Sequence, residues 1–562
     1  RKISVARIDD LIRRRVLSEF RIGTFDNPAK RKADDVSTTA RRAAAADIVS
    51  AGAVLLKNKN DILPLGADIR SIALIGTQAG ENPTVVEMGS AYVTPTHVEP
   101  VLTAMRGRAP ASTTVVYAPG TSGLSRLPLA PPSLFRTDAG EGGLRADYVA
   151  NANLDFSAKP FLSRLEEGVN HEALSTDPIF PANKLWSVRW RGLFMPTETG
   201  IQKFTLAGSG TAELRIGGKL IGRYANTDFG DIIFANIPMV AGKGVPVDVR
   251  WTPRVTFRAA AVDAYGTTLG PVVRLGWSRP DNLLERAVET ARGADVAIVF
   301  VGHRVGEGMD RQSLALPGDQ DALIEAVAKA NPRTVVVLQT GGAVTMPWLD
   351  QVAGVLEMWL PGDTIGSAAA KLLYGDHEPA GRLPVTFPGT EAQGPARMPK
   401  QYPGTLHPET GALDDTHFDE DLLIGYRFWD ARNQEPLFPF GYGLSYTQVQ
   451  MSGLDVNKMA DGGANVRVAL RNVGKRDGAE VVQVYVGFPT SAGAPPKQLK
   501  AISKVHLKAG EARTVEVPLD SRAFQYWNEG RGGWQRDGGP YKIMVGRGLR
   551  DIVYSAELML DK

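Results

Sequence analysis

The chain has 562 residues, of which 43% are hydrophobic and 22% charged, a composition typical of a globular protein. This length predicts about three or four domains at roughly 150 residues each. The small net charge of +3 gives no reason to expect a nucleic-acid partner, the absence of cysteine excludes disulfides and thiolate metal sites, and no apolar run is long enough to predict a membrane-spanning helix.

Residues 1–37 are predicted to form a separate segment that consists of a helix and a linker. Residues 5–22 place apolar side chains at helical spacing and arginines on the opposite face, which predicts a basic amphipathic helix. Such a helix can bind a membrane surface or cover one face of a larger domain, and the ordinary spread of charge favours the second interpretation. The chain begins with Arg1 and has no signal peptide, so we expect a processed chain or one part of something larger.

Residues 38–129 and 281–392 alternate apolar strands with helices. This alternation predicts one α/β domain whose mostly parallel sheet is covered on both faces and whose sequence is interrupted by a long insertion. The predicted helices are residues 39–57, 98–108, 281–293, 319–331 and 364–375. The predicted strands are residues 71–76, 113–120, 294–302, 334–342, 354–362 and 382–387.

The rest of the chain predicts all-β structure joined by a loop. Residues 130–280 combine strand-like alternation with turns rich in Gly, Thr and Pro, which predicts an inserted antiparallel β-sandwich. Its clearest strand signals are residues 185–195, 200–208 and 211–224. Residues 393–446 are irregular and Pro-rich, as expected of a long loop that crosses between domains. Residues 447–562 show short alternating strands at the spacing of a second β-sandwich.

A glycine-rich loop follows the predicted strand 294–302 and carries one carboxylate between glycines, Gly306-Glu307-Gly308. Open α/β sheets bind ligands at the carboxyl ends of their strands, and flanking glycines let the backbone turn sharply and approach a ligand. A carboxyl group partly withdrawn from water has a raised pKa, which suits it to donate a proton. Glu307 is therefore a candidate catalytic acid. A solvated turn residue would show the same pattern, and we expect Asp310 and Arg311 to form an ion pair within the loop.

Other kinds of chemistry find no support in the sequence. The loop lacks the Gly-Lys-Ser/Thr ending of a phosphate loop, and no Gly-x-Ser-x-Gly elbow supports a serine nucleophile. The seven histidines show no metal-ligand spacing. We therefore expect neither a cofactor nor a metal, and the sequence does not identify the residues that bind substrate.

The stretch GEGMDRQSLALPGDQ (306–320) resembles the acid/base loop of glycoside hydrolase family three, which contains many β-glucosidases. The resemblance covers most of the chain outside the insertion. It is also carried by VLLKNKNDILPL (54–65), GSAYVTPTHVEP (89–100), LPGDTIGSAAAKLLYGDHEPAGRLPVTFP (360–388), DEDLLIGYRFWD (419–430) and PLFPFGYGLSYT (436–447). Many members end in a fibronectin type III-like domain. Three stretches near the end of this chain resemble that domain: NVGKRDGAEVVQVYV (472–486), PPKQLKAISKVHLKAGE (495–511) and GPYKIMVG (539–546).

The inserted region resembles the protective-antigen-type β-sandwich that some β-glucosidases carry at this position. The resemblance lies in LWSVRWRGLFMPTETGIQKFTLAGSGTAELRIGGKLI (185–221). In related enzymes this module leans over the cleft and limits the length of the sugar admitted. A general carbohydrate-binding module and a structural spacer are also consistent with the sequence.

By its position in the motif, Glu307 corresponds to the family's general acid/base. The retaining mechanism also needs a nucleophile, with the two carboxyl groups roughly 5–5.5 Å apart. In the family this nucleophile is an Asp on an N-terminal (β/α)₈ barrel, and no stretch of the 562 residues resembles it. We therefore expect a barrel polypeptide or segment outside this chain, with residues 3–28 as the last helix and exit of that barrel. Asp310 is a poor substitute, because it lies three residues from Glu307 on the same loop.

Two classes of function follow from the resemblance. The first is the C-terminal portion of a retaining, exo-acting β-glucosidase that hydrolyses terminal β-D-glucosyl residues of a β-glucoside or short oligosaccharide. The second is a carbohydrate-binding assembly without hydrolysis. A β-xylosidase or related β-glycosidase of the same family is a further alternative. The substrate class favours a periplasmic or extracellular location, and a cytoplasmic one stays open.

Overall fold

The structure is a computed structural model of the chain. It describes residues 3–27, 37–85, 93–172, 185–253, 272–306, 311, 313–396, 398–402, 404–406 and 413–561. The chain divides into two compact units, Arg1–Ala45 and Ala46–Lys562.

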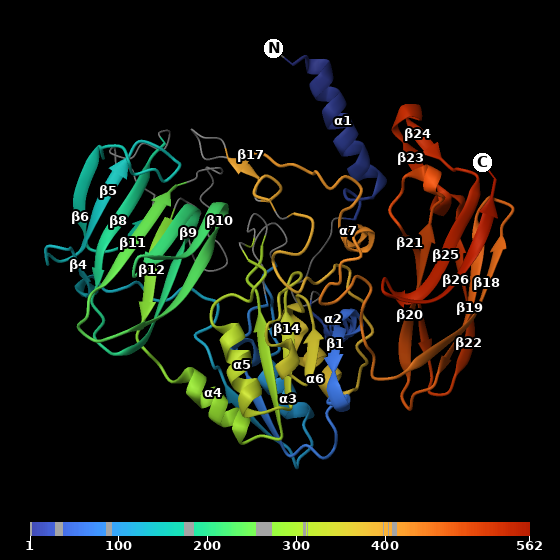
Figure 1. The fold of residues 1–562 in the computed structure, drawn as a ribbon, viewed down its shortest axis with the longest axis horizontal. Helices are drawn as coiled ribbons and strands as arrows, with labels where there is room; N and C mark the ends of the chain where they lie inside the picture. Colours follow the sequence, from blue (N-terminus) through green and yellow to red (C-terminus); the bar gives the residue numbers. More distant parts are fainter. Residues whose placement is uncertain are drawn as a thin grey trace. The chain divides into compact units, whose positions relative to one another are not determined.

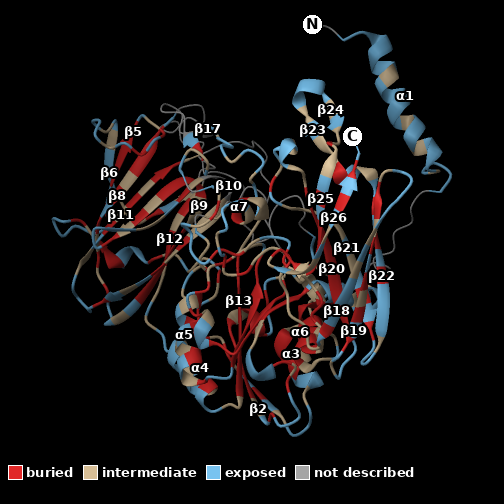
Figure 2. Cartoon of the chain, turned by 45° about the vertical axis from the view of Figure 1, so that its right-hand side comes forward, coloured by how far each residue is buried: buried red, intermediate tan, exposed pale blue. Residues whose placement is uncertain are grey.

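The predicted N-terminal helix is α1 (Val5–Arg21) in the first unit. It starts at Ser4, whose side chain accepts a hydrogen bond of 3.3 Å from the backbone N–H of Arg7. Asp10 pairs with Arg7 at 2.8 Å and with Arg14 at 3.0 Å on the polar face. Within this described helix no residue is buried (Figure 2).

A central sheet joins strands from before and after the insertion (Figure 1). Its order is β1-β15-β14-β13-β2-β3, and every neighbouring pair is parallel except β1 with β15. The predicted mostly parallel sheet is therefore confirmed. The strands are β1 (Val54–Asn58), β2 (Ser71–Ile75), β3 (Thr114–Ala118), β13 (Val296–Gly302), β14 (Thr334–Gln339) and β15 (Gly354–Glu357).

Helices cover both faces of this sheet. α3 (Val101–Arg108) and α6 (Ile365–Tyr374) pack in one hydrophobic core with Ile72 and Leu74 of β2. α4 (Leu283–Arg292) and α5 (Gln320–Ala330) pack in the other. Because successive side chains of a strand point to opposite faces, the apolar run of each central strand fills both cores.

Two sequence predictions in this domain are wrong. The helix expected over residues 39–57 is α2 (Thr39–Gly52), which ends at Gly52, and the apolar residues that follow form the edge strand β1. Residues 382–387 were expected to form a strand, but they make only an isolated bridge between Phe387 and Phe438. Pro384 cannot donate to a strand ladder, and β1 already occupies the edge beside β15.

The inserted region forms an antiparallel sheet around a core rich in Trp and Phe (Figure 1). Its strands are β4 (Phe135–Arg136), β5 (Leu144–Val149), β6 (Leu162–Glu166), β7 (Asn170–Glu172), β8 (Ser187–Phe194), β9 (Gly200–Ile216), β10 (Lys219–Met239), β11 (Val245–Thr252) and β12 (Val272–Ser278). The sheet divides along β9, whose first half pairs with β12 and whose second half pairs with β11. The strand signal of residues 211–224 is two strands, because Gly217 and Gly218 turn the chain at φ +61° and +80°.

Residues 393–446 contain β16 (Thr405–Leu406), β17 (Leu413–Asp415) and α7 (Tyr426–Ala431). The C-terminal region then packs one sheet of order β18-β19-β22 against another of order β21-β20-β25-β26, with a shared buried core (Figure 2). These strands are β18 (Val449–Lys458), β19 (Ala464–Asn472), β20 (Gly478–Gly487), β21 (Gln498–Leu507), β22 (Ala512–Leu519), β25 (Gly539–Gly548) and β26 (Asp551–Leu560), with a hairpin of β23 (Tyr526–Asn528) and β24 (Gly533–Gln535). The predicted all-β sandwich is confirmed.

Candidate active site

A buried amide closes the base of the loop that follows β13. Gln320, the first residue of α5, accepts a 2.8 Å hydrogen bond from the N–H of Gly302 and donates to the carbonyls of Gly302 and Pro317, both at 2.9 Å. A side chain at Gly302 could not be accommodated, because its Cβ would lie 2.6 Å from the carbonyl oxygen of Gln339. The loop therefore starts and ends at one fixed point on the carboxyl edge of the sheet.

Arg311 ties the middle of this loop to the neighbouring loop. Its Nη1 donates to the carbonyl of Ala343 at 2.9 Å and lies 3.3 Å from Nδ1 of His303. The hydroxyl of Tyr402 donates to the carbonyl of Arg311 at 2.8 Å. Burial, together with the nearby Arg311 charge, lowers the pKa of His303 to about 3, so the imidazole is neutral at neutral pH.

The two loop carboxylates singled out by the sequence, Glu307 and Asp310, lie outside the described residues. The structure therefore does not test the role of Glu307 or the expected pairing of Asp310 with Arg311. It does describe Gly302 and Arg311 on either side of them, and both are held in place. The Glu307 loop accordingly leaves the carboxyl end of a central strand, where α/β sheets bind ligands.

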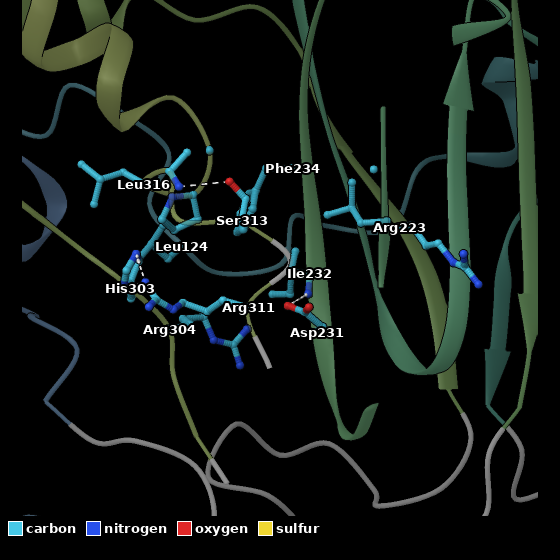
Figure 3. A pocket seen from close by; sticks show the side chains of 15 residues that line it. Leu124, Arg223, Asp231, Ile232, Phe234, His303, Arg304, Arg311, Ser313 and Leu316 are labelled. Atoms are coloured by element: carbon cyan, nitrogen blue, oxygen red, sulfur yellow. Dashed lines mark hydrogen bonds between the residues drawn. The ribbon is translucent and has the colours of Figure 1, made fainter. Parts of the chain in front are cut away.

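A cavity of about 260 Å³ lies between this loop and β10 of the inserted sheet (Figure 3). One part of the lining is apolar and includes Ile232 and Phe234 of β10 and Leu316 of the loop. The remaining lining residues are Leu124, Gly222, Arg223, Asp231, Ile233, His303, Arg304, Arg311, Ser313, Ala315, Pro317 and Gly318. Figure 3 shows Arg223 pointing away from the others, so its charge does not face the cavity.

Charged side chains gather at one end of the cavity. Asp231 lies across from Arg304 and Arg311 in Figure 3. Burial raises the pKa of Asp231, while the N–H of Ile232 at 2.7 Å and the charge of Arg304 oppose that rise. Among the described lining residues Asp231 is the only carboxylate.

Sequence reasoning missed Asp231 and Arg304, because they approach one another from segments about 70 residues apart. Neither belongs to a recognisable motif. The only local signal was the strand-like alternation of residues 211–224, which does not say what β10 faces.

Lys203 fixes the inserted sheet against the loop-bearing domain. Its Nζ lies 2.9 Å from a carboxylate oxygen of Asp281, 3.8 Å from one of Asp319 and 3.0 Å from the hydroxyl of Ser122. Asp281 precedes α4 and Asp319 precedes α5, whereas Lys203 lies on β9 beside β10. This ion-pair cluster thus sets the distance between the two walls of the cavity.

We expect Lys203→Met to destabilise the folded chain by about 1–2 kcal/mol, because it leaves two carboxylates without their cation. The effect is smaller than for a fully buried pair, since the side chains of Asp281 and Asp319 keep 30% and 27% of their exposure. Urea unfolding monitored by tryptophan fluorescence measures the change. Lys219→Met, the same substitution at an exposed residue of β10, is the control, and equal effects of the two variants would contradict the assignment.

The described ranges contain neither a cluster of metal-ligating side chains nor a helix that could span a membrane. Acidic and histidine side chains nowhere gather there in threes that could hold a metal ion. None of the described helices has both the length and the apolar character that crossing a membrane requires.

Two family descriptions match this chain. Residues 53–446 match the glycosyl hydrolase family 3 C-terminal domain, and residues 480–548 match the fibronectin type III-like domain. The first match includes the central sheet, the loop of Glu307 and the cavity walls.

Alignments with curated relatives cover more of this chain than the two family matches do. A β-glucosidase B of Emericella nidulans is 32% identical over 569 residues, which cover 96% of this chain and 65% of the relative. A β-glucosidase of Rhizobium radiobacter is 33% identical over 587 residues, which cover 100% of this chain and 67% of the relative. This chain therefore spans about two thirds of the length of these curated relatives.

Solved structures of β-glucosidases also resemble this chain over most of its length. A β-glucosidase from Streptomyces venezuelae in complex with D-glucose has a TM-score of 0.68 and 32% identity, covering 92% of this chain and 60% of that one. A β-glucosidase from Kluyveromyces marxianus in complex with glucose has a TM-score of 0.63 and 26% identity, covering 94% of this chain and 63% of that one.

Proposed function

The chain belongs to glycosyl hydrolase family 3, and from this membership we propose that it supplies the general acid/base of a retaining β-glucosidase. One observation carries the proposal. The loop that contains Glu307 is anchored at both ends and borders a cavity of about 260 Å³. A cavity of roughly 150 Å³ holds one benzene ring, so this one has room for a ring-sized group with substituents.

In this mechanism Glu307 first acts as an acid. It protonates the glycosidic oxygen while a second carboxylate attacks the anomeric carbon, so the leaving group departs as a neutral alcohol. Glu307 then takes a proton from water, which attacks the glycosyl-enzyme intermediate and releases the sugar with its configuration retained. The comparisons do not place the second carboxylate, so an Asp on a separate barrel stays a prediction.

Glucose is the proposed sugar, because β-glucosidases that resemble this chain were solved with it. A β-xylosidase or related β-glycosidase is the alternative within the family. A periplasmic or extracellular site of action also stays a prediction.

The purified 562-residue chain is expected to bind glucose weakly and to leave an activated aryl β-glucoside uncleaved, because a retaining site needs both carboxyl groups. Adding a family barrel polypeptide should restore release of the aryl alcohol, measured by absorbance. Robust turnover by the chain alone that Glu307→Gln abolishes would refute the divided site. Sugar binding without turnover, even with the barrel present, would favour a carbohydrate-binding assembly.

A further inference from the structure

Glu357, the last residue of β15, is completely buried at the carboxyl edge of the central sheet. The neighbouring strands place Val54 of β1 and Leu338 of β14 at its register, and neither carries a charge. Among the described residues no cation pairs with its carboxyl group. A buried carboxylate without a cation is costly, so this side chain is expected to hold a proton.

The hydrogen bonds around Glu357 locate that proton. The hydroxyl oxygen of Thr340 lies 2.7 Å from Oε2 of Glu357 and 2.9 Å from the carbonyl oxygen of Gly342. A hydroxyl has one hydrogen and a carbonyl oxygen only accepts, so the hydrogen of Thr340 goes to Gly342. The hydrogen between Glu357 and Thr340 must then come from Glu357. Its other oxygen, Oε1, accepts from the N–H of Trp359 at 2.7 Å.

This chain of hydrogen bonds leads to the Glu307 loop. Gly342 precedes Ala343, whose carbonyl accepts the 2.9 Å hydrogen bond from Arg311. A Cβ added at Gly342 would lie 3.4 Å from Nη2 of Arg311, so the backbone of this loop and the guanidinium are in close contact. Arg311 in turn is four residues from Glu307.

We propose that Glu357 is a positioning residue of the acid/base site, a neutral carboxylic acid that holds residues 340–343 in the conformation that anchors Arg311, four residues after Glu307 in the sequence. This inference rests on the function proposed for Glu307. It assigns Glu357 no contact with substrate, and its effect passes through Thr340, Gly342 and Ala343.

Ionisation of Glu357 would break this arrangement. Burial raises its pKa to about 8, and the hydrogen bonds that the ionised carboxylate would accept from Thr340 and Trp359 only partly oppose the rise. Above that pH Oε2 becomes an acceptor, so Thr340 must turn its hydrogen to Glu357 and leave the Gly342 carbonyl without it. Among the described groups of the linked loop, His303 is already neutral and Arg311 stays a cation in this range.

The difference between the folded and unfolded pKa values of Glu357 fixes the direction in which pH changes the stability of the protein. The unfolded carboxyl loses its proton near its ordinary pKa, whereas the folded one keeps it until about pH 8. Between these values the folded state binds more protons, so this group makes the protein less stable as pH rises, and the effect levels off above pH 8.

The experiment compares Glu357→Gln, Glu357→Leu and Thr340→Val in the 562-residue chain, with the barrel added where activity requires it. The glutamine keeps both hydrogen bonds, because its amide donates to Thr340 and its carbonyl accepts from Trp359. We expect Glu357→Gln to keep kcat/KM at pH 7 within about threefold, since a neutral hydrogen bond of similar geometry replaces the original. Between pH 7 and pH 9 the wild type should lose more kcat/KM than Glu357→Gln, because ionisation of Glu307 lowers the rate of both, whereas ionisation of Glu357 lowers only that of the wild type.

The other two variants interrupt the chain of hydrogen bonds. We expect each to lower kcat by about tenfold with KM nearly unchanged, because each leaves a loop group without its partner. Unfolding temperatures show whether the variants fold. Equal losses of kcat/KM between pH 7 and pH 9 in Glu357→Gln and the wild type would overturn the proposal, as would a folded Thr340→Val with full activity.

A second measurement separates this inference from the proposed function. Unfolding of the chain alone, between pH 5 and pH 9, should lose part of its pH dependence in Glu357→Gln, while the part that comes from Glu378 remains. If that change occurs but no preparation hydrolyses a glucoside, the proposed function fails and the positioning role with it, while the neutral acid stands. If hydrolysis occurs and the pH dependence is unchanged, only the inference about Glu357 is overturned.

Discussion

Replacing Glu307 with Gln is expected to lower kcat/KM for an alkyl β-glucoside by about 10²–10⁴ in a preparation that contains the barrel. The amide has no proton to give to the glycosidic oxygen, so the leaving group would have to depart as an alkoxide. A dinitrophenyl glucoside should lose much less in its first step, because its leaving group is stable without a proton. Rates for the two substrates, measured side by side, give this difference directly.

The second half of the reaction provides an independent check. Without a carboxylate to activate water, the glycosyl-enzyme intermediate should accumulate, and azide, which needs no general base, should release it as a β-glucosyl azide. Asp310→Asn is the matched control, since it changes one carboxyl of the same loop to an amide. Equal losses in both variants, with no rescue by azide, would mean that the loop is only structural and would remove Glu307 from the mechanism.

The layered α/β domain could be predicted from the sequence because its strands are continuous apolar runs, and the segments between them place apolar residues at helical spacing. Its errors lie where a tertiary contact decided the structure. Residues 54–58 follow an Ala-rich helix without a proline, yet they complete the sheet edge beside β15. Residues 382–387 have a strand-like composition, but Arg382 turns toward the C-terminal sandwich. Local propensity does not encode such pairings.

The site was predictable only where a motif carries it. The loop of Glu307 has a recognisable pattern, whereas Asp231 and the cavity depend on how the inserted sheet packs. Glu357 did leave a signal, since an acidic residue inside the apolar run GVLEMWLPG is rarely buried without a reason. Its role could not be predicted from the sequence, because its partner Thr340, and Gly342 to which Thr340 is bonded, lie on the loop after the preceding strand.

A buried ion pair joins the central domain to the C-terminal sandwich. Nη2 of Arg382 lies 2.6 Å from Oε1 of Glu480 at β20, and only 9% and 7% of the two side chains are exposed. Glu378 lies nearby and accepts hydrogen bonds from the hydroxyl of Ser445 and, at 2.8 Å, from the N–H of Ala479. Burial raises the pKa of Glu378 to about 7, the charge of Glu480 adds to the rise, and Arg382 opposes it. Arg382 is therefore close to two acidic groups, and the charge of Lys504 also opposes the rise at Glu378.

Arg382→Met is expected to destabilise the attachment of the C-terminal sandwich by about 3–5 kcal/mol at pH 8, because it leaves the buried Glu480 without a cation. At pH 5 the loss should be smaller. The charge of Arg382 opposes the raised pKa of Glu378, so losing it raises that pKa further. The cost of the missing cation is then largest where Glu378 would be ionised, and it lessens at low pH as Glu378 binds a proton. Urea unfolding at the two pH values, with hydrogen exchange of β20 and β25 to localise the change, measures both effects.

Two variants identify the cause of that loss. Arg382→Met with Glu480→Met removes both charges and should recover most of the stability, because an apolar pair in a buried site is often as stable as an ion pair. Arg467→Met breaks the pair with Glu516 in the same sandwich, at 3.3 Å and with 47% and 58% of the side chains exposed, and should change stability by at most about 1 kcal/mol. If the double variant is as unstable as Arg382→Met, the arginine acts through packing of its side chain, and the uncompensated carboxylates are not the source of the loss.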